Sequence, residues 1–146
     1  MKKVLLIVIL LFSMSLLTSC SKDKKTYTCF EYTDSTKLKG IEQFTTVDML
    51  KDTYKEIKLV LNYKDHTFIR TGKFKEDIAD EVHTGTFIEE ENKLIFSYDN
   101  ALKQHFETEW GKEEYVFVGK ELHMRLERGT TAPSGNVYGP LVMKYK

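Results

Sequence analysis

The histidines of this 146-residue chain are one group of residues that could carry chemistry, because their side chains are common metal ligands. The chain has four: His66, His83, His105 and His123. No two of them have the short spacing of a metal motif such as His-x-His or His-x-x-x-His. His105 and His123 alternate with apolar neighbours, which places them on the polar face of their strands. We therefore expect all four to be solvated surface residues, and we predict no metal site and no cofactor.

Carboxylates are the second group, since two of them facing each other in a cleft would suit acid–base catalysis. The candidates are many and include Glu89-Glu90-Glu91, Glu107, Glu109 and Glu113-Glu114. Glu107 and Glu109 alternate with apolar residues, which marks a solvent-facing strand surface, and nothing in the pattern selects a catalytic pair. The chain has no Gly-x-Ser-x-Gly elbow and no phosphate-binding glycine loop. We therefore expect that this protein is not an enzyme.

Cysteine gives the clearest chemical signal. A basic start, Met1-Lys2-Lys3, precedes an apolar run over residues 4–17 that is too short for a membrane span. The run ends in Leu17-Thr18-Ser19-Cys20, which resembles the bacterial lipobox. The resemblance implies a signal peptide whose cleavage leaves Cys20 first in the chain, carrying two or three acyl chains such as palmitate. Several chains on one residue give durable membrane attachment, whereas a single chain holds only marginally.

The leader sets the domain organisation and the expected location. We predict a lipoprotein signal peptide over residues 1–19, a lipid anchor and tether over 20–26, and one domain over 27–146. The membrane would be the outer membrane where the cell has one, and otherwise the outer face of the plasma membrane. The chain has 22 basic and 22 acidic residues, and Lys2 and Lys3 leave with the leader, so the mature net charge is −2. We therefore expect no nucleic-acid partner. With Cys20 lipidated, Cys29 has no disulfide partner, and its strand-like surroundings predict a buried thiol.

Period-two alternation runs through most of the domain and predicts antiparallel strands joined by tight turns. The predicted strands are 27–32, 57–63, 67–74, 83–88, 93–98, 105–110, 114–118, 122–128 and 141–146. A cap-like Thr45 followed by Asp48 predicts one short helix near Thr46 to Tyr54. A meander of eight to ten strands curls, and closing it removes both exposed edges. The fold class is therefore all-β, a small antiparallel meander barrel in which the first and last strands complete the closure.

Three stretches are similar to those of bacterial lipocalin-like lipoproteins, which have calycin-type barrels. They are Asp65-His66-Thr67-Phe68, Gly85-Thr86-Phe87 and Gly119-Lys120-Glu121-Leu122. His66 stands where the family usually has the glycine of an Asp-Gly-Thr-Phe turn. The resemblance implies a small barrel that in some members binds an apolar ligand.

The interior of such a barrel is where a function would reside. Six aromatic residues are expected to face it: Phe68, Phe87, Phe106, Trp110, Tyr115 and Phe117. They either line a ligand cavity or fill the core, because barrels of this size lie at the border between the two. A cavity of roughly 300 Å³ would favour an envelope lipoprotein that binds a small apolar molecule. A filled core with an exposed apolar patch would instead favour an interaction module, such as an inhibitor or assembly factor, for another envelope protein.

Overall fold

The computed structural model describes residues 23–99 and 113–146. Within them, nine strands form a single antiparallel sheet with one short helix. The strands are β1 (Lys24–Lys37), β2 (Thr45–Asp48), β3 (Tyr54–Asn62), β4 (Thr67–Phe74), β5 (Glu81–Glu90), β6 (Lys93–Tyr98), β7 (Glu113–Val118), β8 (Glu121–Leu126) and β9 (Val137–Tyr145). The predicted anchor Cys20 and the predicted strand over 105–110, with Phe106 and Trp110, lie outside the described residues.

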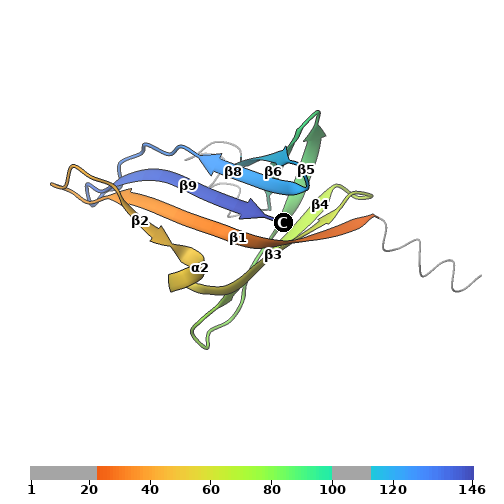
Figure 1. Ribbon diagram of the computed structural model, residues 1–146, viewed down its shortest axis with the longest axis horizontal. Helices are drawn as coiled ribbons and strands as arrows, with labels where there is room; N and C mark the ends of the chain where they lie inside the picture. Colours follow the sequence, from red (N-terminus) through yellow and green to blue (C-terminus); the bar gives the residue numbers. More distant parts are fainter. Residues whose placement is uncertain (1–22, 100–112) are drawn as a thin grey trace, which may run out of the picture.

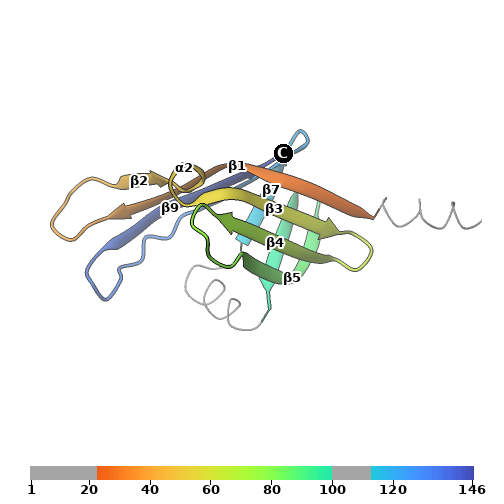
Figure 2. The ribbon, with the colours of Figure 1, turned by 90° about the horizontal axis from the view of Figure 1, so that it is seen from below.

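Strands β1 and β9 close the sheet into a barrel. The sheet order follows the chain from β3 to β9, and β1 pairs with β3 near its start and with β9 along most of its length. Figure 1 shows β1 and β9 side by side along the long axis of the molecule, and Figure 2 shows β3, β4 and β5 following β1 in order. Thr28 and Lys146 exchange two backbone hydrogen bonds, of 2.9 and 3.0 Å, at one end of this seam. The all-β meander barrel predicted from the alternation is therefore confirmed.

Alternation along each strand decides which side chains face the interior. In β3, Ile57, Leu59 and Leu61 are buried while Lys58 is exposed, as the period-two pattern predicts. In β4 the buried set is Phe68, Arg70 and Gly72, so the strand places one arginine among apolar side chains. The interior is consequently a hydrophobic core that also contains charge.

The region around helix α2 (Met49–Asp52) differs from the prediction of a helix near Thr46 to Tyr54. Residues Thr45–Asp48 form the strand β2, which pairs with β1, and Tyr54 begins β3. Three residues of β2 are β-branched, namely Thr45, Thr46 and Val47, and such residues favour extended backbone. Asp48, not Thr45, caps the helix: its Oδ1 accepts hydrogen bonds from the amides of Leu50 and Lys51, both at 3.1 Å. The helix is thus one turn long and begins later than predicted.

His66 occupies the position in the β3–β4 turn where a glycine would be expected. It has a φ of +54°, in the left-handed region that favours glycine. Its carbonyl oxygen accepts a 2.9 Å hydrogen bond from the amide of Phe87, and its ring lies 5.6 Å from the Phe87 ring. These contacts hold the residue in a conformation that the backbone alone disfavours.

Candidate functional site

A small cavity of about 70 Å³ lies inside the barrel and is lined by both charged and apolar side chains. The lining residues are Tyr32, Tyr54, Ile57, Arg70, Gly72, Glu81, His83, Glu113, Met124, Leu126, Leu141 and Met143. This volume is well below the roughly 300 Å³ at which small-molecule sites begin. It has room for a few water molecules, since one water needs only about 10 to 15 Å³ of such space. The cavity is therefore suited to one small polar group and not to a whole apolar ligand.

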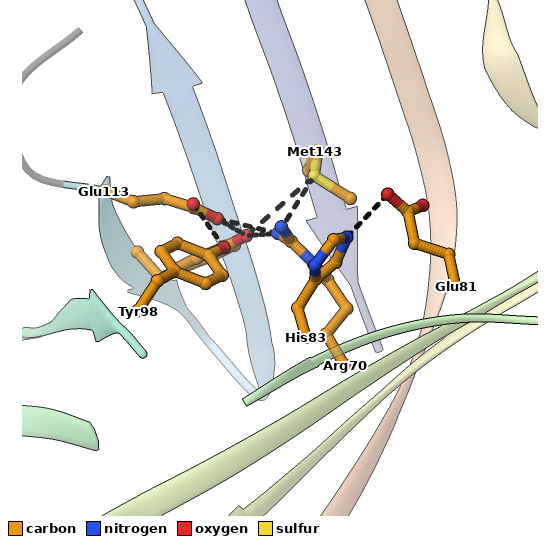
Figure 3. Close-up of polar contacts among 7 residues, drawn as sticks. Arg70, Glu81, His83, Tyr98, Glu113 and Met143 are labelled. Atoms are coloured by element: carbon orange, nitrogen blue, oxygen red, sulfur yellow. Dashed lines mark hydrogen bonds and ion pairs between the residues drawn. The ribbon is translucent and has the colours of Figure 1, made fainter. Parts of the chain in front are cut away.

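Arg70 and Glu113 form the charged centre of the cavity (Figure 3). They project from β4 and β7, and Nη1 of Arg70 donates to Oε1 of Glu113 at 2.9 Å. Arg70 is 8% exposed and Glu113 is 4% exposed, so both charges are removed from water. The same Nη1 lies 3.3 Å from the Tyr115 hydroxyl and 3.7 Å from the Met143 sulfur. A buried ion pair persists only where such additional contacts satisfy its remaining polar atoms.

Phenols complete this network. The hydroxyls of Tyr98 and Tyr115 both donate to the Glu113 carboxylate, and the Arg70 guanidinium lies 5.1 Å from the centre of the Tyr98 ring. Burial, together with the neighbouring carboxylate, raises the pKa of both phenols well above the ordinary value. Burial opposes the charge of Arg70, but Glu113 and the surrounding phenols hold its pKa above the ordinary value. The network therefore keeps Arg70 charged and both phenols protonated.

A second polar group, Glu81 with His83 on β5, lies at the edge of the same cavity. His83 Nε2 is 2.6 Å from Oε1 of Glu81, and the Tyr54 hydroxyl donates to Oε2 at 2.7 Å. The hydrogen bond with His83 and then that from Tyr54 lower the pKa of Glu81 against the opposing effect of burial. In Figure 3, Glu81 meets His83 on one side of the view while Glu113 meets Arg70 on the other. The cavity thus contains two carboxylates, both of them hydrogen-bonded.

His83 departs from the expectation that all four histidines are solvated. Its side chain is only 13% exposed, whereas those of His66 and His123 are 54% and 27% exposed, and His105 lies outside the described residues. The reason is strand phase, because His83 is on the same face of β5 as the buried Gly85 and Phe87. Sequence reasoning missed it, although this phase was the signal that could have identified it.

Stacked aromatic rings form one wall of the site. The rings of Tyr32 and Tyr54 stack with centroids 6.0 Å apart, and Tyr54 stacks on Phe74 at 4.8 Å. Burial raises the pKa of Tyr32 to about 12. Gly72 permits this arrangement, because a Cβ at that position would lie 2.9 Å from Cε1 of Tyr54. The wall therefore presents neutral phenol rings to the cavity.

The aromatic residues expected to line a ligand cavity lie elsewhere in the interior. Phe68, Phe87 and Tyr115 are buried in the core, where Phe68 stacks on Phe96 with centroids 4.4 Å apart. Phe117 is partly buried and packs against this core. None of these four lines the cavity, whereas Arg70, Glu81, His83 and Glu113 do. Phe106 and Trp110 are outside the described residues.

The cavity and the start of the barrel are at different ends of the sheet. Lys24, the first residue of β1, pairs with Asn62 at the end of β3. Tyr54 and Ile57, which line the cavity, are at the start of β3. A nine-residue strand is about 25 to 30 Å long, so the cavity lies toward the end of the barrel away from Lys24.

The described part of the chain contains neither a metal-binding cluster nor a membrane-spanning helix. Among residues 23–99 and 113–146, no three His, Cys, Asp or Glu side chains gather as a group that could hold a metal ion. In the same part of the chain, no helix has the length and apolar character needed to cross a membrane.

Comparisons with known proteins leave the family open. No family model matches the chain, and no curated protein matches it. It is similar to a solved structure described as the crystal structure of a surface lipoprotein, with a TM-score of 0.46 and 11% sequence identity. The similarity covers 84% of this chain and 61% of that one, so this chain spans less than two thirds of the other's length. The role of this protein must therefore be inferred from its own sequence and its own site.

Proposed function

We propose that this chain is a lipid-anchored protein of the bacterial cell envelope whose barrel is a binding module. The observation that carries the proposal is Leu17-Thr18-Ser19-Cys20 at the end of a short apolar leader. The first barrel strand begins at Lys24, only four residues beyond the predicted lipid. An extended chain spans at most about 3.6 Å per residue, so this end of the barrel would stay within about 15 Å of the bilayer surface. The cavity, toward the other end, would then face away from the membrane.

The anchor is tested by comparing the two cysteines in cells that process lipoproteins. Cys20→Ser removes the thiol that the lipobox presents, so it should abolish incorporation of labelled palmitate and partitioning into the detergent phase. Cys29→Ser is the matched control, because this buried cysteine is in the barrel and outside the lipobox. It should leave both properties unchanged. Palmitate labelling that survives Cys20→Ser would overturn the proposal.

Binding, and not catalysis, is the activity we propose for the cavity. The carboxylate of Glu113 already accepts from Arg70, Tyr98 and Tyr115, and Glu81 accepts from Tyr54 while pairing with His83. The lowered pKa of Glu81 suits a permanent negative charge and not a general acid, which needs a pKa near the working pH. The packed core and the small volume favour a polar group over an apolar ligand as the occupant.

A second candidate function is the interaction module. The connection between β1 and β2 extends beyond the barrel in Figure 1 and exposes Leu38, Ile41 and Phe44. Exposed apolar side chains on a projecting hairpin are typical of a protein contact. The double variant Leu38→Asp, Ile41→Asp should abolish specific cross-linked products in intact cells if this hairpin binds a partner. Ile88→Asp, which alters an exposed residue on β5, should keep them. Unchanged products in the double variant would exclude the hairpin as the contact.

A further inference from the structure

The charges around the cavity are unequal. Arg70 and Glu113 neutralise each other at 2.9 Å, and both are buried. Glu81 instead contacts the Tyr54 phenol and the His83 imidazole, which is charged only when it is protonated. The lining therefore contains two carboxylates and one permanent cation, Arg70, and Glu81 is the carboxylate without a permanent cation at hydrogen-bond distance.

Glu81 also has hydrogen-bonding capacity beyond these two contacts. A carboxylate can accept about four hydrogen bonds, and the contacts of Glu81 within the described chain occupy one position on each oxygen. The sulfur atoms of Met124 and Met143, which also line the cavity, are weak acceptors. Arg70 is the one permanent cation in the lining, and its Nη1 is directed at Glu113, Tyr115 and Met143. Glu81 therefore keeps acceptor positions that a donor on a ligand could use.

The aromatic wall and the volume narrow the class of ligand. Tyr32 and Tyr54 place two stacked phenol rings on the lining, and aromatic rings attract cations. A volume of about 70 Å³ accommodates a small polar head group and is too small for a whole drug-sized ligand. Glu81 has a 37% exposed side chain and lies where the cavity meets solvent, so the rest of a larger molecule could remain outside.

We propose that this cavity binds the primary ammonium group of a small amine, with Glu81 as its counter-ion and Tyr32 and Tyr54 as its aromatic wall. The proposal deepens the proposed function, in which this cavity is the binding site. An anionic group is the opposite possibility, because Arg70 is present. Its charge is already balanced by Glu113 at hydrogen-bond distance, so an anion would gain little and would meet the repulsion of Glu81.

Methionine methyl groups report directly on the cavity. Met124 and Met143 line it, Met49 is in helix α2, and the other methionines, Met1 and Met14, are in the leader. The full chain is labelled at the methionine methyl carbons and kept in a neutral detergent, and the chemical shifts of these methyl groups are followed by NMR. It is titrated with methylammonium chloride, with sodium acetate and with sodium chloride at matched ionic strength. Methylammonium should shift the Met124 and Met143 signals saturably and leave Met49 unmoved.

Glu81→Gln is the decisive variant, since it keeps an acceptor for Tyr54 and removes the charge. It should weaken methylammonium binding about tenfold or more, because a hydrogen bond to a charged group contributes about 1.5 to 3 kcal/mol. The matched control is Glu121→Gln. Glu121 pairs with His123 at 2.7 Å in the same Glu-x-His pattern, but on the outside of β8, so affinity should stay within about twofold, as for other surface changes. If Glu81→Gln does not fold, Tyr32→Leu replaces it and should weaken binding severalfold by removing one ring.

Three results would overturn the proposal: saturable shifts with acetate in place of methylammonium, no saturable shift with either probe, or wild-type affinity in Glu81→Gln. The same titration on the Cys20→Ser chain separates this proposal from the anchor. Equal affinity in that chain is expected whether or not Cys20 is lipidated. Failure of the anchor and failure of the ligand assignment are therefore distinguishable.

Discussion

Arg70 and Glu113 meet inside the barrel with 2.9 Å between Nη1 and Oε1, although they are 43 positions apart in the chain. The two residues are on β4 and β7, strands that are separated in the sheet by β5 and β6. Their contact therefore crosses the interior and does not follow a strand pair. Removing both charges from water is costly, and the network of phenols offsets part of that cost.

The first prediction is that this pair is strongly coupled. Arg70→Leu and Glu113→Leu should each reduce the free energy of unfolding by about 3 to 5 kcal/mol, because each leaves an unpaired buried charge. The double variant should lose much less than the sum, since no charge is then left behind. Urea unfolding of the four proteins measures the coupling. The exposed pair Arg125 and Glu127 is the control, where Arg125→Ala should have little effect. Additive losses at Arg70 and Glu113 would contradict this account.

The architecture was predictable because alternation is a local signal. The predicted strands 67–74 and 93–98 coincide with β4 and β6, and the predicted closure by the first and last strands matches the pairing of β1 with β9. Strands such as β4 bury alternate residues, so the buried face can be recognised in the sequence without knowing the neighbouring strands. The short helix was placed too broadly, since pairing with β1 holds Thr45–Asp48 in a strand.

The cavity was not predictable in the same way. Glu81 and His83 repeat the spacing of Glu121 and His123, and both pairs are in contact, at 2.6 and 2.7 Å. One pair lines the cavity and the other is on the outside of the barrel, because β5 and β8 have opposite phase at these positions. Which face of a strand points inward can be recognised from the sequence of that strand alone. Which residue of a distant strand lies opposite Arg70 depends on the curvature and register of the whole barrel.

The second prediction concerns Gly85, in the Gly85-Thr86-Phe87 stretch. A Cβ at position 85 would lie 2.1 Å from the backbone oxygen of Ser97 and 2.8 Å from Cε1 of Phe68. Gly85→Ala should therefore destabilise the barrel by about 3 kcal/mol or more, at the upper end of overpacking costs. Gly72→Ala is the comparison, because there the nearest atom, at 2.9 Å, belongs to the Tyr54 side chain and not to the backbone. Thermal unfolding should rank Gly85→Ala as the less stable variant, and the reverse order would count against a rigid contact with Ser97.

The third prediction is loss of stability at high pH. Burial raises the pKa of Tyr32 from 10.0 to about 12, so the fold favours the neutral phenol. The unfolded chain releases this proton first, and the stabilisation is therefore complete below about pH 10 and is lost as the pH rises toward 12. Denaturant midpoints should fall over that interval while tyrosinate absorbance rises. Tyr32→Phe cannot ionise and should make the decline shallower, and an identical pH profile in that variant would contradict the assignment.

The last prediction uses Cys29 to test whether the seam of the barrel is closed. Cys29 is buried in β1 opposite Tyr145 of β9, and its Sγ donates to the Glu31 carbonyl at 3.3 Å. Burial raises the pKa of the thiol from 9.0 to about 11, so the thiolate, which is the reactive form, is about a hundredfold scarcer near neutral pH.

Cys29 is the only thiol in the Cys20→Ser chain, which makes it a clean probe. A thiol reagent at neutral pH should label this chain slowly when it is folded and rapidly in denaturant, at a rate set by opening of the seam. Tyr145→Ala removes a fully buried ring beside Cys29, so labelling of the folded chain should accelerate. Val118→Ala, an exposed change on β7, should not alter the rate. Equal labelling rates in the folded and unfolded chain would mean that β1 and β9 are not paired at Cys29, and the closed barrel would have to be replaced by an open sheet.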